Sequence, residues 1–418
     1  MSDLNPANAP RAVARGVAAA PAAMILLVLV GLNLRPFLTS VGPVLDIVRA
    51  DTGLDFRAVA MLTTLPFVLM GVGAGVGAGL ARRFGEKRAL GAALLLLAAG
   101  CTSRLWAANG ASLITGAGIA GAGVAMIQAM MPGLAKRWFP DRLPLAMGLY
   151  SAALVGGGAF GAVTSPWLAT HGGWHLALAV WAVPALGTLA LWLANAPRGT
   201  AGIGARAGIA TGTNGNGIAI SAFFRNPRAW QLAIYFGLAN SGYSSLVAWL
   251  PSFYRQVGMS PQASGNLLAW MAVFQAAGAL LVPMLARRAT DRRGALWLTL
   301  ALQAVGFAGF ATLPSFAPWC WVACAGVGLG GFFALSLIVT LDHLSDAQRA
   351  GALAAFVQGV GFLLAATGPW LIGWLRDAGG GFAAAWSMHL AVAVAMGALT
   401  AAFSPASYRR SMALIDKL

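Results

Sequence analysis

Arg35 is the residue whose type and position say most about chemistry. The apolar run before it, Val17 to Leu32, is 16 residues long, which as a helix spans about 24 Å. A hydrocarbon core is about 30 Å thick, so a helix that crosses it has to continue through Arg35. A cation at that depth costs about 2.5–3.5 kcal/mol or more unless it faces a protein interior or a water-filled cavity. Because a guanidinium stays charged and presents a planar fork of donors, we expect Arg35 to bind an anion.

Two prolines follow Arg35 and predict that the helix bends or opens around it. Pro36 and Pro43 have no N–H group, so the carbonyl groups four residues before each of them lose their helical partners. Asn33 precedes the arginine by two residues, and Thr39 follows it by one turn. The charge is therefore expected to lie beside polar side chains and freed carbonyl groups.

An alternative role for Arg35 is that of an internal strut paired with a carboxylate. All 11 Asp and Glu residues lie in tails, loops or helix ends, and Asp46 and Asp342 are the nearest candidates. Since no carboxylate lies in the middle of an apolar stretch, we favour an arginine that faces a substrate and keep the strut as the alternative.

Polar residues in other apolar stretches are candidates to complete the site. Besides Arg35 and Asn33, the predicted substrate-binding residues are Gln128, Asn240, Tyr243 and Gln358. Asn240 and Tyr243, three residues apart, share one face of a helix. For each neutral residue, a hydrogen bond between helices is an equally good interpretation. His389 is a candidate for coupling to protons because it titrates near neutral pH, although a packed histidine is the favoured interpretation.

The composition is that of a membrane protein and excludes a soluble enzyme. Only 9% of the 418 residues are charged and 59% are apolar, with a mean hydropathy of +0.76, whereas soluble domains carry about 25% charged residues. Twelve stretches are long and apolar enough to cross a bilayer: about 19–46, 56–80, 89–108, 111–134, 146–169, 174–194, 229–254, 262–286, 294–314, 318–341, 351–375 and 382–404.

The distribution of basic residues predicts the orientation. With the N-terminus placed in the cytoplasm, 21 of the 27 Lys and Arg residues fall in cytoplasmic segments, 5 fall at outer ends, and Arg35 remains. This bias supports an even number of spans with both termini cytoplasmic. The net charge of +16 is therefore explained by topology, and we do not expect nucleic acid as a partner.

A polar linker and two repeats divide the chain into halves. We predict a cytoplasmic tail over 1–18, a six-helix bundle over 19–194, a linker over 195–228, a second six-helix bundle over 229–404 and a cytoplasmic tail over 405–418. The loop residues Arg82, Arg83 and Glu86 recur as Arg287, Arg288 and Asp291, and we expect both loops to act in gating. Pro166-Trp167-Leu168 likewise recurs as Pro369-Trp370-Leu371. A 6+6 parallel repeat is the layout of major facilitator transporters, with the substrate between the halves.

Several segments carry a more specific resemblance: Gly31-Leu32-Asn33-Leu34-Arg35-Pro36, Gln128-Ala129-Met130-Met131-Pro132, Ala248-Trp249-Leu250-Pro251, Leu341-Asp342-His343 and Gln358-Gly359-Val360-Gly361-Phe362. With these segments the chain resembles the cyanate-transporter family of the major facilitator superfamily, which also includes 2-nitroimidazole transporters. The resemblance covers nearly the whole chain and implies an all-α protein of the bacterial inner membrane. It implies transport of a small anion such as cyanate, or alternatively of a small neutral heteroaromatic compound.

The expected mechanism is alternating access, in which the halves rock around a central site that contains Arg35. Moving an anion into a negative interior opposes about 2.3 kcal/mol per 100 mV, so uptake needs H⁺, a counter-anion or rapid consumption inside. We expect no enzymatic activity, no cofactor and a monomer. Cys101, Cys320 and Cys324 lie in apolar stretches without metal-ligand spacing, so we expect no metal.

Overall fold

The computed structural model describes residues 9–139, 143–195, 220–345, 347–379 and 381–416. The predicted linker over 195–228 lies largely outside these residues. In the N-terminal half the elements are α1 (Ala9–Asn33), α2 (Pro36–Thr39), α3 (Val41–Thr52), α4 (Phe56–Phe84), α5 (Glu86–Thr102), the 3₁₀ helix η2 (Ser103–Trp106), α6 (Gly110–Trp138), α7 (Leu143–Ala179) and α8 (Ala182–Asn195).

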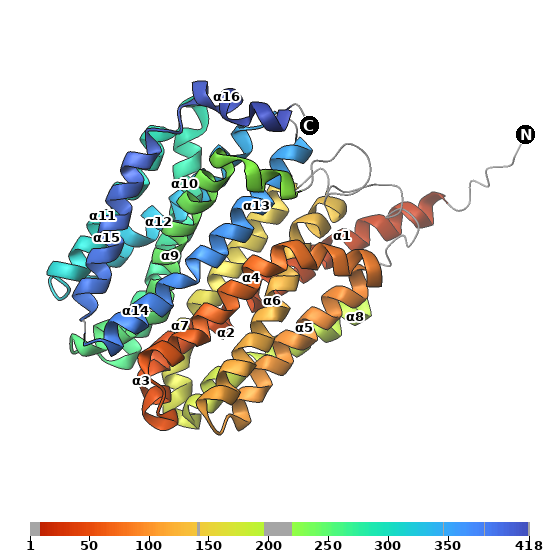
Figure 1. The fold of residues 1–418 in the computed structure, drawn as a ribbon. Coiled ribbons are helices and arrows are strands. Elements are labelled where there is room, and N and C mark those ends of the chain that lie inside the picture. Colours follow the sequence, from red (N-terminus) through yellow and green to blue (C-terminus); the bar gives the residue numbers. More distant parts are fainter. Residues whose placement is uncertain (1–8, 140–142, 196–219, 346, 380, 417–418) are drawn as a thin grey trace, which may run out of the picture.

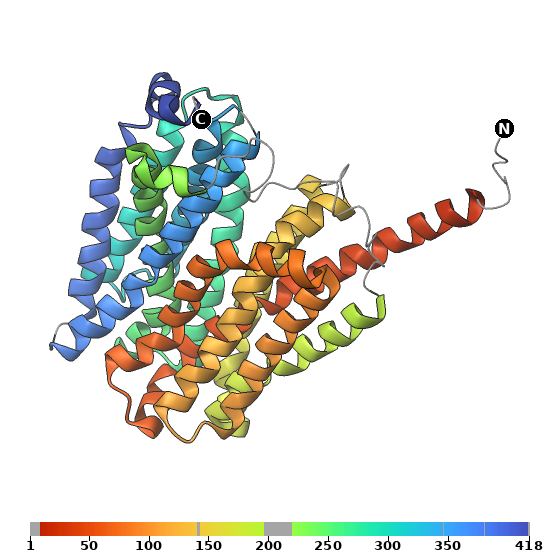
Figure 2. The ribbon, with the colours of Figure 1, turned by 45° about the vertical axis from the view of Figure 1, so that its right-hand side comes forward.

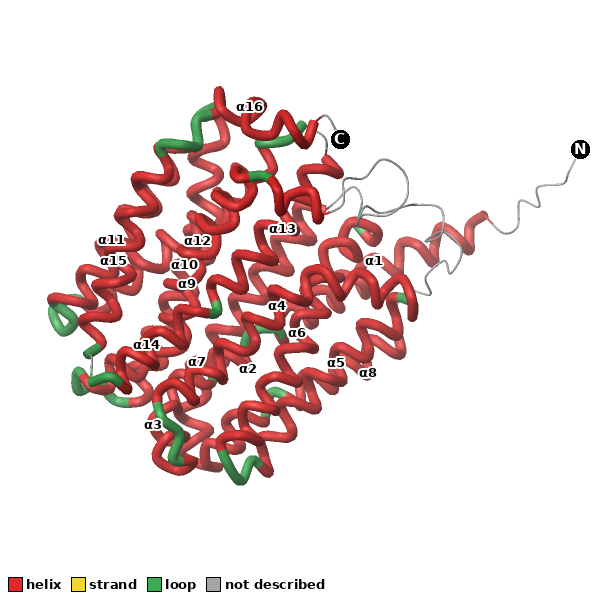
Figure 3. Tube along the Cα trace, viewed as in Figure 1, coloured by secondary structure: helices red, strands yellow, loops and turns green. Residues whose placement is uncertain are grey.

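The C-terminal half has the same all-helical character. Its elements are η4 (Ile220–Arg225), α9 (Pro227–Gln256), α10 (Pro261–Leu285), η5 (Ala286–Arg288), α11 (Arg293–Thr312), α12 (Pro318–Asp342), α13 (Ala347–Ala365), α14 (Thr367–Asp377), α15 (Phe382–Thr400) and α16 (Pro405–Asp416). Helix α16 occupies the predicted C-terminal tail. Throughout the described residues the regular structure is helical (Figure 3), as the sequence predicts.

Ten spans in the described residues are long and apolar enough to cross a membrane. The other two predicted crossings fall on α8, which has 14 residues, and on α9, which has 30 residues but is rich in serine. Helix α7 contains the predicted span 146–169 and the start of the span 174–194, and Gly173 breaks the helix between them with a φ of 75° and a ψ of 166°. That left-handed φ favours glycine, which explains why the chain turns back there.

The helices form two bundles that lie side by side, α1 to α8 in one and α9 to α15 in the other (Figures 1 and 2). We call the end that carries α16 the terminal end and the opposite end the distal end. Helix α7 packs on α10, and α4 packs on α13 and α14. Pro166 lies in α7 and Pro369 in α14, so the second repeat marks helices that join the bundles.

Three glycines of α7 allow it to pack against the backbone where α1 gives way to α2. A Cβ added to Gly157 would lie 2.1 Å from the carbonyl oxygen of Leu32. A Cβ added to Gly158 would lie 3.0 Å from the Cβ of Arg35, and one added to Gly161 would lie 2.8 Å from the Cα of Pro36. The backbone of α7 therefore supports the segment that carries Arg35.

We predict that Gly157→Ala lowers the melting temperature of the detergent-solubilised protein. The added methyl group overlaps a main-chain carbonyl group, and such overpacking costs about 1–3 kcal/mol. Gly156→Ala is the matched control, because a Cβ there meets no heavy atom within 4 Å, and alanine gains up to about 1 kcal/mol of helix propensity over glycine. Equal melting temperatures for the two variants would contradict this contact.

Helix α16 covers the terminal end of the C-terminal bundle. The rings of Tyr408 and His343 stack with their centroids 3.9 Å apart, and Met412 is fully buried. Arg228 at the start of α9 donates to the hydroxyl oxygen of Ser407 at 2.6 Å. Burial lowers the pKa of His343 to about 4, so this histidine is neutral when folded at neutral pH.

The protein should therefore lose stability as the pH falls from about 6.5 towards 4. In this window the unfolded chain protonates His343 before the folded protein does, so acid favours unfolding. We expect a loss on the order of 1 kcal/mol at pH 5.5. Melting temperatures measured from pH 7.5 to 5.5 should fall less for His343→Asn than for the wild type. Parallel curves would show that His343 does not contribute.

Candidate functional site

Arg35 lies at the interruption of the first membrane-crossing segment. Helix α1 ends at Asn33 and α2 begins at Pro36, with Arg35 as the residue that precedes α2 (φ −112°, ψ −29°). The hydroxyl group of Thr39 donates to the carbonyl oxygen of Gly158 at 2.8 Å and ties α2 to α7. The predicted opening of the helix around the arginine is confirmed.

The side chain of Arg35 contacts a neutral partner in the other bundle. Its Nη1 donates to the hydroxyl oxygen of Tyr243 at 2.6 Å, and its Cζ lies 5.0 Å from the centre of that ring. The two carboxylates considered as strut partners are engaged elsewhere. Asp46 accepts from Ser252 at 2.6 Å, and Asp342 pairs with Arg292 at 2.7 Å. The geometry therefore favours the interpretation that the guanidinium is available to an anion.

A cavity of about 30 Å³ adjoins Arg35 at the junction of the bundles. Its polar lining comes from Arg35, Thr39, Tyr243 and Gln275, and its apolar lining comes from α7, α9 and α10. The volume accommodates about one or two water molecules. Arg35 is the charged residue among those that line it, so the cavity carries a single positive charge in apolar surroundings.

Two hydrogen-bond donors of residues that line this cavity have no acceptor in the described structure. The Nε of Arg35 is buried without a partner in the described structure. The Tyr243 hydroxyl group accepts from Arg35, so its own proton remains available for donation. Hydrogen bonds from a guanidinium to an anion are about twice as strong as neutral ones. The pair therefore offers donors from both bundles to one small acceptor.

The structure brings Tyr243 to Arg35 but places the other predicted residues elsewhere. Asn33 donates to Thr188 of α8 at 2.9 Å, and Asn240 donates to the carbonyl oxygen of Phe236 at 2.8 Å. Gln128 on α6 and Gln358 on α13 are half-buried and do not line the cavity. Both asparagines thus make hydrogen bonds inside their own bundles.

His389 is also engaged inside its own bundle. Its Nε2 lies 2.9 Å from the hydroxyl oxygen of Ser245, and its ring stacks on Phe307 with centroids 5.2 Å apart. It is 3% exposed and is not part of the cavity lining. His389 is therefore packed inside the bundle, which is the interpretation that the sequence favours over a role in proton coupling.

The two predicted gating loops occupy equivalent places, one between α4 and α5 and the other between α10 and α11. The side chains of Arg82 and Arg287 are outside the part of the chain that the structure describes. Arg83 and Arg288 are exposed, and Glu86 begins α5. Asp291 pairs with Arg293 at 2.6 Å, and this hydrogen-bonded contact lowers the pKa of the aspartate.

Two residues near the site were missed by sequence analysis. Gln275 lines the cavity. The feature of the sequence that could have identified it is an amide side chain within an apolar stretch. Arg104, expected at an outer end, is 1% exposed and donates to the carbonyl oxygen of Phe37 in α2 at 3.0 Å. Arg104 thus holds the short helix that begins next to Arg35.

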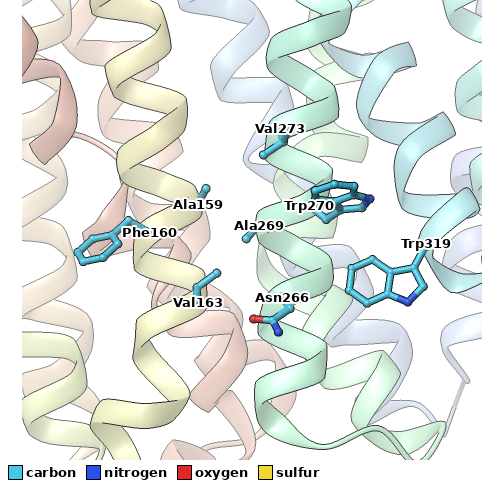
Figure 4. A pocket seen from close by; sticks show the side chains of 8 residues that line it. All are labelled: Ala159, Phe160, Val163, Asn266, Ala269, Trp270, Val273 and Trp319. Atoms are coloured by element: carbon cyan, nitrogen blue, oxygen red, sulfur yellow. The ribbon is translucent and has the colours of Figure 1, made fainter.

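A larger groove of about 730 Å³ lies along α7 and α10 (Figure 4). Phe160, Trp270 and Trp319 line it, and Asn266 supplies its polar group. All three aromatic side chains are exposed, as expected for a surface that faces hydrocarbon. The lining contains no charged residue, so this groove is a poor candidate for binding an anion.

Comparison with known proteins agrees with this architecture. Residues 23–369 match the model of the Major Facilitator Superfamily. The chain is 44% identical to the cyanate transport protein CynX of Escherichia coli, over 92% of this chain and 98% of that protein. It is 32% identical to the 2-nitroimidazole transporter of the same species, over 90% of this chain and 93% of that protein.

Solved structures show the same fold at low sequence identity. The nucleoside transporter NupG aligns with a TM-score of 0.73 and 13% identity, over 92% of this chain and 98% of that one. The D-xylose-proton symporter aligns with a TM-score of 0.71 and 15% identity, over 91% and 96% of the two chains. The helices, the arginine at the bundle junction and these similarities lead to one conclusion: this chain is a multi-pass membrane transporter that belongs to the major facilitator superfamily.

Proposed function

We propose that this transporter moves a small, cyanate-like anion across the bacterial inner membrane by alternating access, with Arg35 as the anion-binding residue. The observation that carries the proposal is the guanidinium at the bundle junction, whose partner is the neutral hydroxyl group of Tyr243. The similarity to a cyanate transport protein supports the same substrate class.

The proposed moving units are the two bundles, 19–194 and 229–404, joined by the linker over 195–228. Both termini are placed in the cytoplasm, so the distal end is the outer one. Several polar contacts between the bundles lie towards this distal end. They support a state that is closed towards the outside, and the protein is proposed to act as a monomer.

Anion binding at this site follows from the donors described above. The anion accepts from the guanidinium of Arg35 and from the hydroxyl group of Tyr243, and the apolar walls strengthen both contacts by excluding water. Because each donor belongs to a different bundle, one small ion contacts both moving units. Inward movement of the charge needs coupling to H⁺ or to a counter-anion, or rapid consumption of the anion inside.

A second candidate substrate is a small neutral heteroaromatic compound such as a 2-nitroimidazole. The 32% identical relative and the ring of Tyr243 beside the cavity support it, with Arg35 holding the nitro group. The volume favours the compact anion, because 30 Å³ is far below the roughly 300–1,000 Å³ of sites for drug-sized ligands.

We predict that Arg35→Gln abolishes saturable cyanate uptake in proteoliposomes and weakens cyanate binding by about 100-fold or more, because charge-assisted hydrogen bonds are lost. Arg35→Lys should retain partial binding, since the charge remains but the planar fork is lost. Each variant is compared with the wild type for folding by size-exclusion chromatography. Undiminished uptake by a folded Arg35→Gln protein would rule out this role.

Tyr243→Phe should weaken cyanate binding by about 10-fold. The variant keeps the ring beside Arg35 but removes a donor to a charged ligand, which is worth about 1.5–3 kcal/mol. Isothermal titration with cyanate measures the change, and Tyr235→Phe serves as a control, because that hydroxyl group bonds Thr400 inside the C-terminal bundle. Equal affinities for the wild type and Tyr243→Phe would remove the tyrosine from the site.

A further inference from the structure

Four arginines gather where the bundles meet at the distal end, away from the Arg35 cavity. Arg49 and Arg57 come from the N-terminal bundle, and Arg255 and Arg376 come from the C-terminal bundle. Two carboxylates, Asp46 and Asp377, contact them there. We call this set of six residues the distal cluster. It carries twice as many cations as anions.

Two further carboxylates nearby are hydrogen-bonded to neutral donors. Asp51 accepts from the indole N–H of Trp174 at 2.9 Å. Asp55 accepts from the backbone N–H of Ala58 at 2.6 Å and begins helix α4. Both carboxylates keep their charge, but in the described structure neither contacts a guanidinium group of the distal cluster.

Asp377 joins the two bundles through the start of α4. Its carboxylate accepts from the backbone N–H groups of Phe56 and Arg57, both at 3.0 Å, and from the Nε of Arg57 at 3.0 Å. A carboxylate at a helix N-terminus is stabilised by free N–H groups and by the helix dipole. Asp46 makes a second link, at 3.5 Å from Arg255.

Two of the four guanidinium groups face an aromatic ring where a carboxylate would bind better. The Cζ of Arg49 lies 3.4 Å from the centre of the Phe56 ring, and the Cζ of Arg376 lies 4.4 Å from the same centre. Arg376 also lies 4.1 Å from the centre of the Phe382 ring. The Nε of Arg49 and the Nη1 of Arg255 are buried without partners in the described structure. Cation–π contacts contribute about 0.5–2 kcal/mol. An anion that reaches these guanidinium groups can therefore replace their contacts with the aromatic rings.

We propose that the distal cluster is an external recruitment site for small monovalent anions, in which Asp46 and Asp377 act as built-in competitors that hold the mouth closed. An entering anion takes the donors of the four arginines as the bundles part. This inference rests on the proposed function, because it needs an anionic substrate and a distal end that faces outwards. It adds a second anion site, separate from Arg35 and reached first from the outside.

The test measures zero-trans cyanate uptake into proteoliposomes of uniform orientation. The double variant Arg49→Gln/Arg376→Gln should lower external kcat/KM by about 10-fold, within the range that electrostatic steering gives to association rates. Arg49→Lys/Arg376→Lys should stay within about 2-fold of the wild type, because a point charge still attracts the anion. Arg410→Gln removes one exposed arginine on α16 and is the control for loss of a charge away from the distal cluster.

The salt dependence of uptake is a second readout, because a purely structural role of the arginines would not change it. Raising external sodium gluconate from about 20 to 300 mM should lower kcat/KM of the wild type about 5-fold and that of the double Gln variant less than 2-fold. The same change inside the vesicles should have little effect. Asp377→Asn should lower the external KM about 3-fold, because it removes a competitor for the arginines.

The outcomes distinguish failure of the recruitment site from failure of the proposed function. If the wild type does not transport cyanate, or if Arg35→Gln transports it normally, the proposed function fails. If wild-type uptake depends on Arg35 but the double Gln variant keeps its kcat/KM and salt dependence, the recruitment site is overturned. The recruitment site is also overturned if Arg410→Gln lowers kcat/KM as much as the double Gln variant does. The same holds if the external KM of Asp377→Asn is equal to or above that of the wild type.

Discussion

The cost of holding a guanidinium inside a membrane governs the central part of this structure. An unpaired cation there costs several kcal/mol, so Arg35 needs a partner, a helix break that exposes it and a packed wall around it. Tyr243 supplies the partner at 2.6 Å, and the interruption between Asn33 and Pro36 supplies the exposure. Because the partner is neutral, the positive charge is solvated without being cancelled, as an anion-binding site requires.

The same constraint explains the character of α9. Between Tyr235 and Tyr254 every residue except Leu238 is buried, although the segment contains Asn240, Tyr243 and several serines. Polar groups that faced lipid would lack partners, so a helix of this composition belongs between other helices. Ser244 shows how such a helix satisfies polar groups of its neighbours, because it donates to the carbonyl oxygen of Ala365 at 2.6 Å. That carbonyl oxygen lacks its helical N–H partner, since the residue four positions later is Pro369.

The sequence predicted the features that depend on local chemistry. The opening at Arg35 follows from Pro36, and the two-bundle layout follows from the repeats and the length of the apolar stretches. The rotation of each helix about its axis could not be predicted, because lipid is as apolar as a protein core and leaves no amphipathic signal. Asn33 and Asn240 therefore bond partners in their own bundles. Gln275, which was not predicted, lines the cavity. Arg104 counts only as an outer arginine in the sequence, because nothing local indicates that it donates to the carbonyl oxygen of Phe37.

The hydrogen bond between Arg35 and Tyr243 has a consequence for the carrier cycle. It joins residues 208 positions apart, one in each bundle, so reorientation of the empty protein under alternating access has to stretch or break it and leave a cation poorly solvated. A bound anion neutralises that cation during the same movement. With the proposed anionic substrate, we expect the loaded carrier to cross a lower barrier than the empty one, so that one-for-one exchange of anions is faster than net flux.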